Sequence, residues 1–243
     1  MTTRTNSLLI LTLVLTLCMV GCSSSEDAST PDASLPTTNT VAGGPGAAAP
    51  ASAGTPAALE TFPTIENVNP QINMQPEVLI VTSVGNIRVR LDAEKAPVAV
   101  DNFLRNYVDQ QFYEGTIFHY VDNGFMAAAG GYTADMQPKA TQPAILNEAE
   151  NGLKNVRGAI AMARHPDYRN TATSQFFINL ADNPTLDHQS RDSDAEYGYC
   201  VFGKVVEGMD VVDQIAAVPV HDLPQFPSIP VTPVVIESIR TVK

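Results

Sequence analysis

Apolar and polar side chains alternate along much of the C-terminal part of this 243-residue chain, a pattern typical of half-buried β-strands. Residues 78–82 are continuously apolar up to a threonine, and residues 87–91 read Ile-Arg-Val-Arg-Leu, so that every second side chain is basic. A short turn at residues 83–85 separates the two segments. They predict an antiparallel hairpin whose second strand has one solvent-exposed face.

Further segments extend this pattern into a complete fold. Strands are predicted at 116–121, 125–129, 159–163, 175–180, 200–205 and 234–242. Helical spacing of apolar residues begins at Pro97 and recurs over 207–218. Eight strands and two helices predict a mainly β fold, a closed eight-stranded antiparallel barrel with two capping α-helices. Because side chains fill the interior of such a barrel, we expect a ligand on the outer wall.

Residues 1–21 have the features of an export signal. Arg4 precedes an apolar run over residues 8–20 that is interrupted only by two threonines. At about 1.5 Å per residue, this run is too short for a bilayer core of about 30 Å. Its length is typical of a signal-peptide core.

The end of this run resembles the bacterial lipobox, although Met19 stands where leucine is usual. Gly21 precedes Cys22, and three serines follow it. The resemblance implies cleavage before Cys22 and acylation of both its thiol and its new amino group. More than one acyl chain gives stable membrane anchoring. Ordinary cleavage elsewhere, with Cys22 left as an unmodified thiol, is the alternative.

Residues 22–75 are rich in Ser, Thr, Ala, Pro and Gly, and they predict a disordered tether. A flexible chain of about 50 residues has a typical reach of about 40 Å. Residues 76–243 then form one domain of ordinary size.

Charge and cysteine content narrow the functional classes. The chain has 14 basic and 26 acidic residues and a formal net charge of −12. That balance argues against binding to nucleic acid or to an anionic membrane surface by charge. Cys18 and Cys22 belong to the export segment, so Cys200 has no disulfide partner in the mature domain. Its apolar surroundings predict a buried, inert thiol.

The four histidines, His119, His165, His188 and His221, lack the spacing of a metal site, and we expect neither metal nor cofactor. Because neighbouring side chains alternate along a strand, His119 should face away from Tyr120. We expect it to be a core histidine with satisfied hydrogen bonds.

Several short motifs occur in order along residues 76–243. They are APVAVDNF at 96–103, GTIFH at 115–119, GFM at 124–126, NEA at 147–149, RGAIAMA at 157–163, SQFFIN at 174–179, LDH at 186–188 and VFGKV at 201–205. Together they resemble the cyclophilin family of peptidyl-prolyl cis-trans isomerases, in particular its bacterial periplasmic members. The resemblance implies the cyclophilin barrel and an enzyme that isomerises X-Pro bonds.

The resemblance also implies a substrate site. The positions that should line the pocket for the proline ring are Phe125, Met126, Phe177 and Leu186. The positions that should hold the substrate backbone are Ala163 and Arg164, the latter standing where many relatives have asparagine. Tyr199 stands at a groove position where relatives have an aromatic residue or histidine. Gln175 matches a glutamine that bonds the substrate, although bonding of local backbone is an equal alternative.

Two positions depart from the family pattern. Tyr120 stands where the family has an arginine, and Ala128 where it has a glutamine that holds this arginine. Rotation about an X-Pro bond crosses a barrier of roughly 18–20 kcal/mol, and a donor aimed at the proline nitrogen stabilises the twisted transition state. Charge-assisted hydrogen bonds are about twice as strong as neutral ones. With Tyr120 and Gln175 as the candidate catalytic residues and Ala128 among the substrate-binding positions, we expect reduced turnover.

These features together predict a monomeric, lipid-anchored isomerase that assists the folding of exported proteins. It would act on their Pro-containing segments in the bacterial cell envelope, facing the periplasm or the exterior. The alternative is a non-catalytic protein that binds such segments as a chaperone or scaffold. Tyr120 and Ala128 favour the alternative, whereas Phe125, Met126 and Phe177 are compatible with either.

Overall fold

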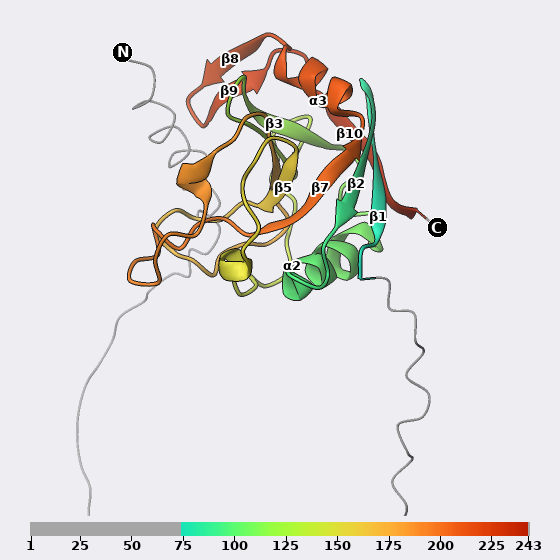
Figure 1. Ribbon diagram of the computed structural model, residues 1–243. Helices are drawn as coiled ribbons and strands as arrows, with labels where there is room; N and C mark the ends of the chain where they lie inside the picture. The colour runs from blue at the N-terminus through green and yellow to red at the C-terminus, as the bar shows by residue number, and fades with distance from the viewer. Residues whose placement is uncertain (1–73, 243) are drawn as a thin grey trace, which may run out of the picture. The chain divides into compact units, whose positions relative to one another are not determined.

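The computed structural model describes residues 74–242, so the expected signal peptide, Cys22 and nearly all of the tether lie outside the described residues. Eight antiparallel strands close into a barrel in the order β1-β10-β3-β4-β6-β5-β7-β2, which confirms the predicted fold (Figure 1). The strands are β1 (Glu77–Thr82), β2 (Gly85–Leu91), β3 (Thr116–Asp122), β4 (Met126–Thr133), β5 (Ala159–Met162), β6 (Phe176–Asn179), β7 (Val201–Glu207) and β10 (Val235–Val242).

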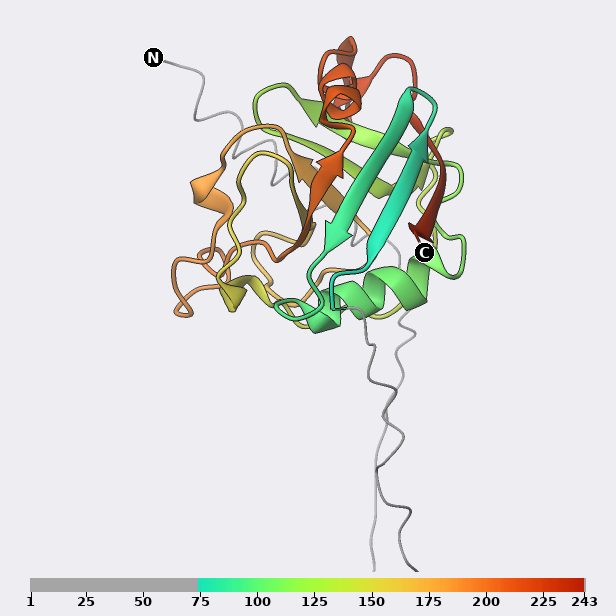
Figure 2. The same cartoon turned by 45° about the vertical axis from the view of Figure 1, so that its right-hand side comes forward.

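Two helical segments cover opposite ends of the barrel (Figures 1 and 2). The first is α2 (Pro97–Asp101), which continues directly into the π-helical η2 (Asn102–Val108). The second is α3 (Met209–Ala216), which buries Val212 and Ile215. Two short 3₁₀ turns, η3 (Ala149–Asn151) and η4 (Pro184–Leu186), lie in the connections. None of the helices within residues 74–242 is long and apolar enough to cross a membrane.

The pattern of residues did not predict a second, two-stranded sheet made of β8 (Val220–Leu223) and β9 (Phe226–Pro230). Prolines at both ends of β9 conceal it, since proline is depleted from strands. Its Phe226 packs against Tyr132, with the ring centroids 4.9 Å apart. Likewise, β4 is longer than predicted because two glycines near its end conceal the strand.

Aromatic side chains fill one end of the barrel. Phe103 of η2 lies with its ring centroid 5.7 Å from that of Phe176, 5.2 Å from that of Phe202 and 5.3 Å from that of Tyr113. All four side chains are buried in the interior cluster, which also contains the alternate apolar residues of β1 and β2. Because this packed core occupies the lumen, a ligand has to bind elsewhere. Cys200 belongs to the same cluster, which confirms that its thiol is buried, and burial raises the pKa of that thiol to about 12.

A remote carboxylate caps the start of α2. Ala96 at the N-cap contributes no side-chain hydrogen bond. Instead, the Val98 and Ala99 backbone N–H groups donate to the two carboxylate oxygens of Glu148 at 3.0 and 2.8 Å. An anion that accepts from free N–H groups at a helix start also interacts favourably with the helix dipole. Glu148 thereby ties the loop before β5 to the helix that plugs the barrel.

We predict that Glu148→Ala lowers the free energy of unfolding by about 1–2 kcal/mol, because it leaves two helix N–H groups without their charged acceptor. Urea denaturation monitored by circular dichroism measures this change. Glu150→Ala is the control, since Glu150 lies in the same loop and pairs with the exposed Arg191. That change should cost less than about 0.5 kcal/mol, and equal losses for the two variants would contradict the capping role.

Candidate functional site

Strand register places one residue from each of five neighbouring strands in a row across the outer wall. Tyr120 of β3 pairs with Ala128 of β4, and Ala128 pairs with Phe177 of β6. Phe177 pairs with Ala161 of β5, which in turn pairs with Val201 of β7. Paired residues on adjacent strands are close enough for their side chains to interact. The small Ala128 therefore lies between the two large rings of Tyr120 and Phe177.

This row is the centre of an apolar cluster that is separate from the barrel interior. We call it the outer-wall cluster; its buried members are Tyr120, Met126, Ala128, Ala159, Ala161, Ala163, Phe177, Leu186, Tyr199 and Val201, with Phe125 and Leu153 partly buried against it. It brings together eight of the ten residues that the family resemblance implied for the site. The other two, Arg164 and Gln175, lie outside it.

A β-bulge in β3 determines which residues face this cluster. Phe118 pairs with Ala129 and Tyr120 with Ala128, so His119 is an extra residue on β3. Phe118 and Val121 both belong to the interior cluster, which leaves His119 and Tyr120 together on the outer side. The prediction that His119 faces away from Tyr120 is therefore wrong, because strict alternation fails at a bulge.

His119 is buried, as predicted, but its hydrogen bonds are not satisfied as we expected. Its ring lies 4.9 Å from that of Tyr132, and neither ring nitrogen makes a well-formed hydrogen bond. Burial lowers the pKa of His119 to about 4, although the nearby Ile117 backbone and Gln175 side chain favour the charged form. The imidazole is consequently neutral at pH 7.

The hydroxyl of Tyr120 is directed toward a carboxylate. It donates to Asp122 Oδ2 at 3.4 Å, a long contact between two residues on the same face of β3. Burial raises the pKa of Tyr120, and the Asp122 charge raises it further, so the phenol stays protonated. Tyr120 is thus a neutral donor whose proton already has an anionic acceptor.

Gln175 lies at the edge of the site, against the backbone of β4. A Cβ atom on Gly131 would come within 2.7 Å of the Gln175 side chain, so a larger residue at position 131 would displace Gln175. The Gln175 backbone carbonyl accepts from the Ala163 N–H at 2.9 Å. The residue thus fixes the chain just before Arg164.

The Arg164 side chain faces the neighbouring loops and is 2% exposed. Its guanidinium donates to the carbonyl oxygens of Gly198, His165, Pro166 and Asp194, at 2.7–2.8 Å. Burial lowers its pKa. Its Cζ lies 4.6 Å from the centroid of the Tyr199 ring, so it contacts the outer-wall cluster through that ring.

A chain of buried asparagines behind the cluster was missed by the sequence reasoning. Asn183 Nδ2 donates to the Phe125 carbonyl at 2.9 Å and to Asn179 Oδ1 at 2.7 Å. Asn179 donates to Asn155 Oδ1 at 3.3 Å, and the Asn155 N–H donates to Asp187 at 2.7 Å. These bonds hold the segments that carry Phe125 and Leu186. The only sequence signal is the presence of asparagine inside or beside strands, where it is usually depleted.

Comparison with known proteins adds three findings. The family model described as "Cyclophilin type peptidyl-prolyl cis-trans isomerase/CLD" matches residues 77–241. The chain is similar to peptidyl-prolyl cis-trans isomerase A of Dickeya dadantii, with 52% identity over 68% of this chain and 84% of that protein. It is also similar to peptidyl-prolyl cis-trans isomerase B of Escherichia coli, with 48% identity over 65% of this chain and 94% of that protein.

A solved structure shares the fold. The crystal structure of a Cryptosporidium parvum cyclophilin-type isomerase, determined in the presence of the dipeptide Ala-Pro, superposes with a TM-score of 0.57 at 25% identity. The match covers 69% of this chain and 99% of that one.

The buried imidazole predicts a specific pH dependence of stability. The pKa of His119 is 6.5 when unfolded and about 4 when folded, so between these values the unfolded state binds more protons. Its contribution is fully present above pH 6.5 and is lost as the pH falls toward 4, by about 3 kcal/mol in total.

Urea denaturation at pH 7, 6, 5 and 4 checks this prediction. His119→Phe keeps a ring against Tyr132 and removes the titrating group, so its free energy of unfolding should fall less than that of the natural protein over this range. Above pH 7 the two proteins should show parallel pH profiles. Parallel profiles between pH 6.5 and 4 as well would contradict the prediction.

Proposed function

This chain belongs to the cyclophilin-type peptidyl-prolyl cis-trans isomerases, and on that premise we propose that it assists the folding of exported proteins with reduced turnover. The observation that carries the proposal is the row Tyr120–Ala128–Phe177 on the outer wall of the barrel. This row keeps the apolar surface of the site but has no cation at the position where the family has its arginine.

In the proposed reaction, the apolar members of the outer-wall cluster receive the proline ring. Met126, Phe177 and Leu186 suit a ring that has no backbone N–H to satisfy. The substrate backbone lies along the segment at Ala163 and Arg164, just beyond β5. The Ala-Pro dipeptide used with the Cryptosporidium parvum relative supports a ligand of this kind.

Reduced turnover follows from the donors that this site offers. As the X-Pro bond twists, the proline nitrogen gains lone-pair character, and a donor aimed at it would stabilise the transition state. Tyr120 supplies only a neutral hydroxyl, which is already directed toward Asp122. Arg164 brings a cation to the cluster, but four carbonyl oxygens hold its guanidinium. Neither group can replace a free, charged donor.

The second candidate function, favoured by this pair Tyr120 and Ala128, is non-catalytic binding of Pro-containing segments as a chaperone or scaffold. The apolar cluster supports binding in either case. A protease-coupled cis/trans assay on a short Ala-Pro peptide separates the two functions, since only the enzyme accelerates isomerisation above the uncatalysed rate.

We further propose that the protein is a monomeric lipoprotein of the bacterial cell envelope. The sequence around Cys22 supports an acyl anchor, and residues 22–75 would let the domain reach about 40 Å from it. Barrel closure supports a monomer, because it leaves no unpaired edge in the main sheet for another chain.

A four-member set of variants tests the catalytic part. Tyr120→Arg alone should recover little activity, because Ala128 is too short to hold a guanidinium that can instead pair with Asp122. Tyr120→Arg combined with Ala128→Gln should raise kcat/KM by at least about tenfold and by more than the product of the two single effects. The measurement is kcat/KM for X-Pro isomerisation in all four proteins.

Tyr120→Phe is the control, because it removes the hydroxyl but keeps the ring. Two results together would show that transition-state donation is unnecessary here: a natural protein as fast as a typical family member, and a Tyr120→Phe variant that loses nothing.

Mass spectrometry of the mature protein tests the anchor. We predict acyl chains on an N-terminal Cys22, and Cys22→Ala should move the protein from the membrane to the soluble fraction. Cys18→Ala is the matched control and should leave it in the membrane. A Cys22→Ala protein that is processed normally and stays membrane-bound would refute lipidation.

A further inference from the structure

We propose that Arg164 is a positioning residue that sets the shape of the substrate site by locking two loops onto Tyr199. The inference rests on the proposed function, because it concerns how that same site holds a Pro-containing peptide. The two loops are residues 165–172, between β5 and β6, and residues 187–199, between η4 and β7.

The guanidinium connects both loops at once. Nη1 donates to the carbonyl oxygens of His165 and Pro166, at 2.7 and 2.8 Å, which holds the first loop. Nε and Nη2 donate to the carbonyls of Gly198 and Asp194, each at 2.8 Å, which holds the second. Four of the five N–H donors of one buried side chain are therefore used on backbone.

The second loop is folded tightly at the point that Arg164 grips. Gly198 has φ +82°, and a Cβ atom there would come within 2.5 Å of the His188 backbone. Its carbonyl also accepts from Asn147 Nδ2 at 3.0 Å. The next residue, Tyr199, donates its N–H to the Leu186 carbonyl at 2.8 Å. The hydrogen bond from Arg164 to Gly198 thus lies one residue from the hydrogen bond between Tyr199 and Leu186, which are both members of the outer-wall cluster.

Ring contacts link the Arg164 guanidinium to the substrate site. The guanidinium stacks over Tyr199, with 4.6 Å from Cζ to the ring centroid. Tyr199 meets Phe177 edge to face, with centroids 5.8 Å apart and an interplanar angle of 75°. Burial raises the pKa of Tyr199 to about 12 even though Arg164 opposes this shift, so the ring stays neutral. The stack therefore orients Tyr199, and through it one face of Phe177.

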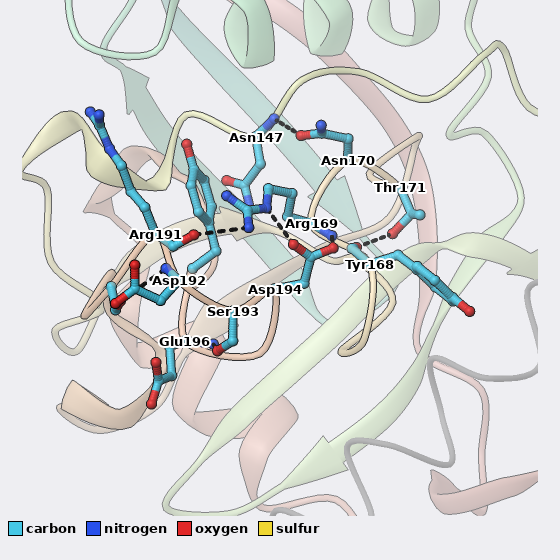
Figure 3. A network of polar contacts seen from close by, with 12 residues as sticks. Asn147, Tyr168, Arg169, Asn170, Thr171, Arg191, Asp192, Ser193, Asp194 and Glu196 are labelled. Atoms are coloured by element: carbon cyan, nitrogen blue, oxygen red, sulfur yellow. Dashed lines mark hydrogen bonds and ion pairs between the residues drawn. The ribbon is translucent and has the colours of Figure 1, made fainter.

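A second arginine, Arg169, braces the same loop, and its Cζ lies 4.4 Å from the centroid of the Tyr197 ring. The Arg169 backbone N–H donates to Asp194 Oδ2 at 3.0 Å, its side chain pairs with the same carboxylate, and Nη2 donates to the Arg191 carbonyl at 3.1 Å (Figure 3). Asp194 therefore gives its carbonyl to Arg164 and its carboxylate to Arg169. This division leaves the Arg164 guanidinium bonded to backbone oxygens rather than to an acid.

Lysine cannot reproduce this arrangement. An ammonium is a compact point charge with three donors and no plane that can stack on a ring. The four carbonyl oxygens around Arg164 instead need donors spread over a wide guanidinium. Arg164→Lys and Arg164→Met should therefore both release Tyr199. Tyr199 and Phe177 would form the wall of the site and would not donate to the proline nitrogen. Their displacement should therefore weaken peptide binding and leave kcat largely unchanged.

The test measures, on the full mature protein, the Kd for a fluorescent tetrapeptide containing Ala-Pro together with kcat and KM for its isomerisation. Arg164→Lys and Arg164→Met should each raise Kd and KM on the order of tenfold, with kcat within about twofold. The control is Arg191→Met, in the same loop, which removes an exposed pair with Glu150 and should change neither constant.

Tyr199→Leu supplies a second measurement that leaves the four hydrogen bonds of the Arg164 guanidinium intact. Its effect on Kd should be comparable to that of Arg164→Lys, and the double variant should lose less than the product of the two single losses, because both act through one contact. This arm decides the question if the Arg164 variants do not fold by circular dichroism: an unchanged Kd in Tyr199→Leu overturns the inference.

Folded Arg164 variants with a lower melting temperature but an unchanged Kd would show that Arg164 only stabilises the loops, which also overturns the inference and leaves the proposed function intact. A natural protein that neither binds nor isomerises the peptide would refute the proposed function itself. The inference would then fall with it.

Discussion

Pairing of β1 with β10 and of β2 with β7 closes the sheet, and the side chains that fill the resulting barrel exclude a ligand from its interior. Phe103 and the aromatic residues around it occupy one end of the lumen. The barrel wall therefore has an inner and an outer apolar face. Its inner face stabilises the fold, and its outer face carries the cluster around Phe177.

In the site that we propose, the outer face keeps the apolar half of a cyclophilin site and changes its polar half. Apolar surface binds a proline ring in its ground state and its twisted state alike, so it supports affinity rather than rate. The rate depends on a donor that meets the nitrogen only in the twisted state. With Tyr120 next to Ala128, the site has a large neutral ring opposite a methyl group, and the two substitutions fit each other sterically. This difference between affinity and rate is the physical basis of the reduced turnover that we propose.

Polar side chains around the cluster hold its segments in place through hydrogen bonds to backbone and to other side chains. The asparagine chain through Asn179 fixes the segments of Phe125 and Leu186, and Arg164 fixes the loops beside Tyr199. Each group is buried and bonded mainly to backbone or to other amides. Since an unpaired buried donor or carbonyl would be costly, these networks tolerate few alternative loop conformations.

The sequence by itself determined the eight strands of the closed barrel and its two capping helices, and its resemblance to cyclophilins implied eight members of the outer-wall cluster. Alternation along 87–91 indicates strands because it follows the local backbone period, whereas the site residues came only from the family resemblance that the ordered motifs carry. It did not reveal β8 and β9, whose prolines hide a strand pattern, or the bulge at His119, which depends on pairing with β4.

The role of Arg164 shows most clearly what only the tertiary structure decided. Its position in sequence suggested contact with substrate, yet its side chain is directed to four carbonyls from segments up to 34 residues away. No local pattern encodes the position of a carbonyl oxygen on a distant loop. Which donors are free and which are already bonded is fixed only when the loops pack together, because a hydrogen bond depends on the distance and angle between groups that lie far apart in the sequence.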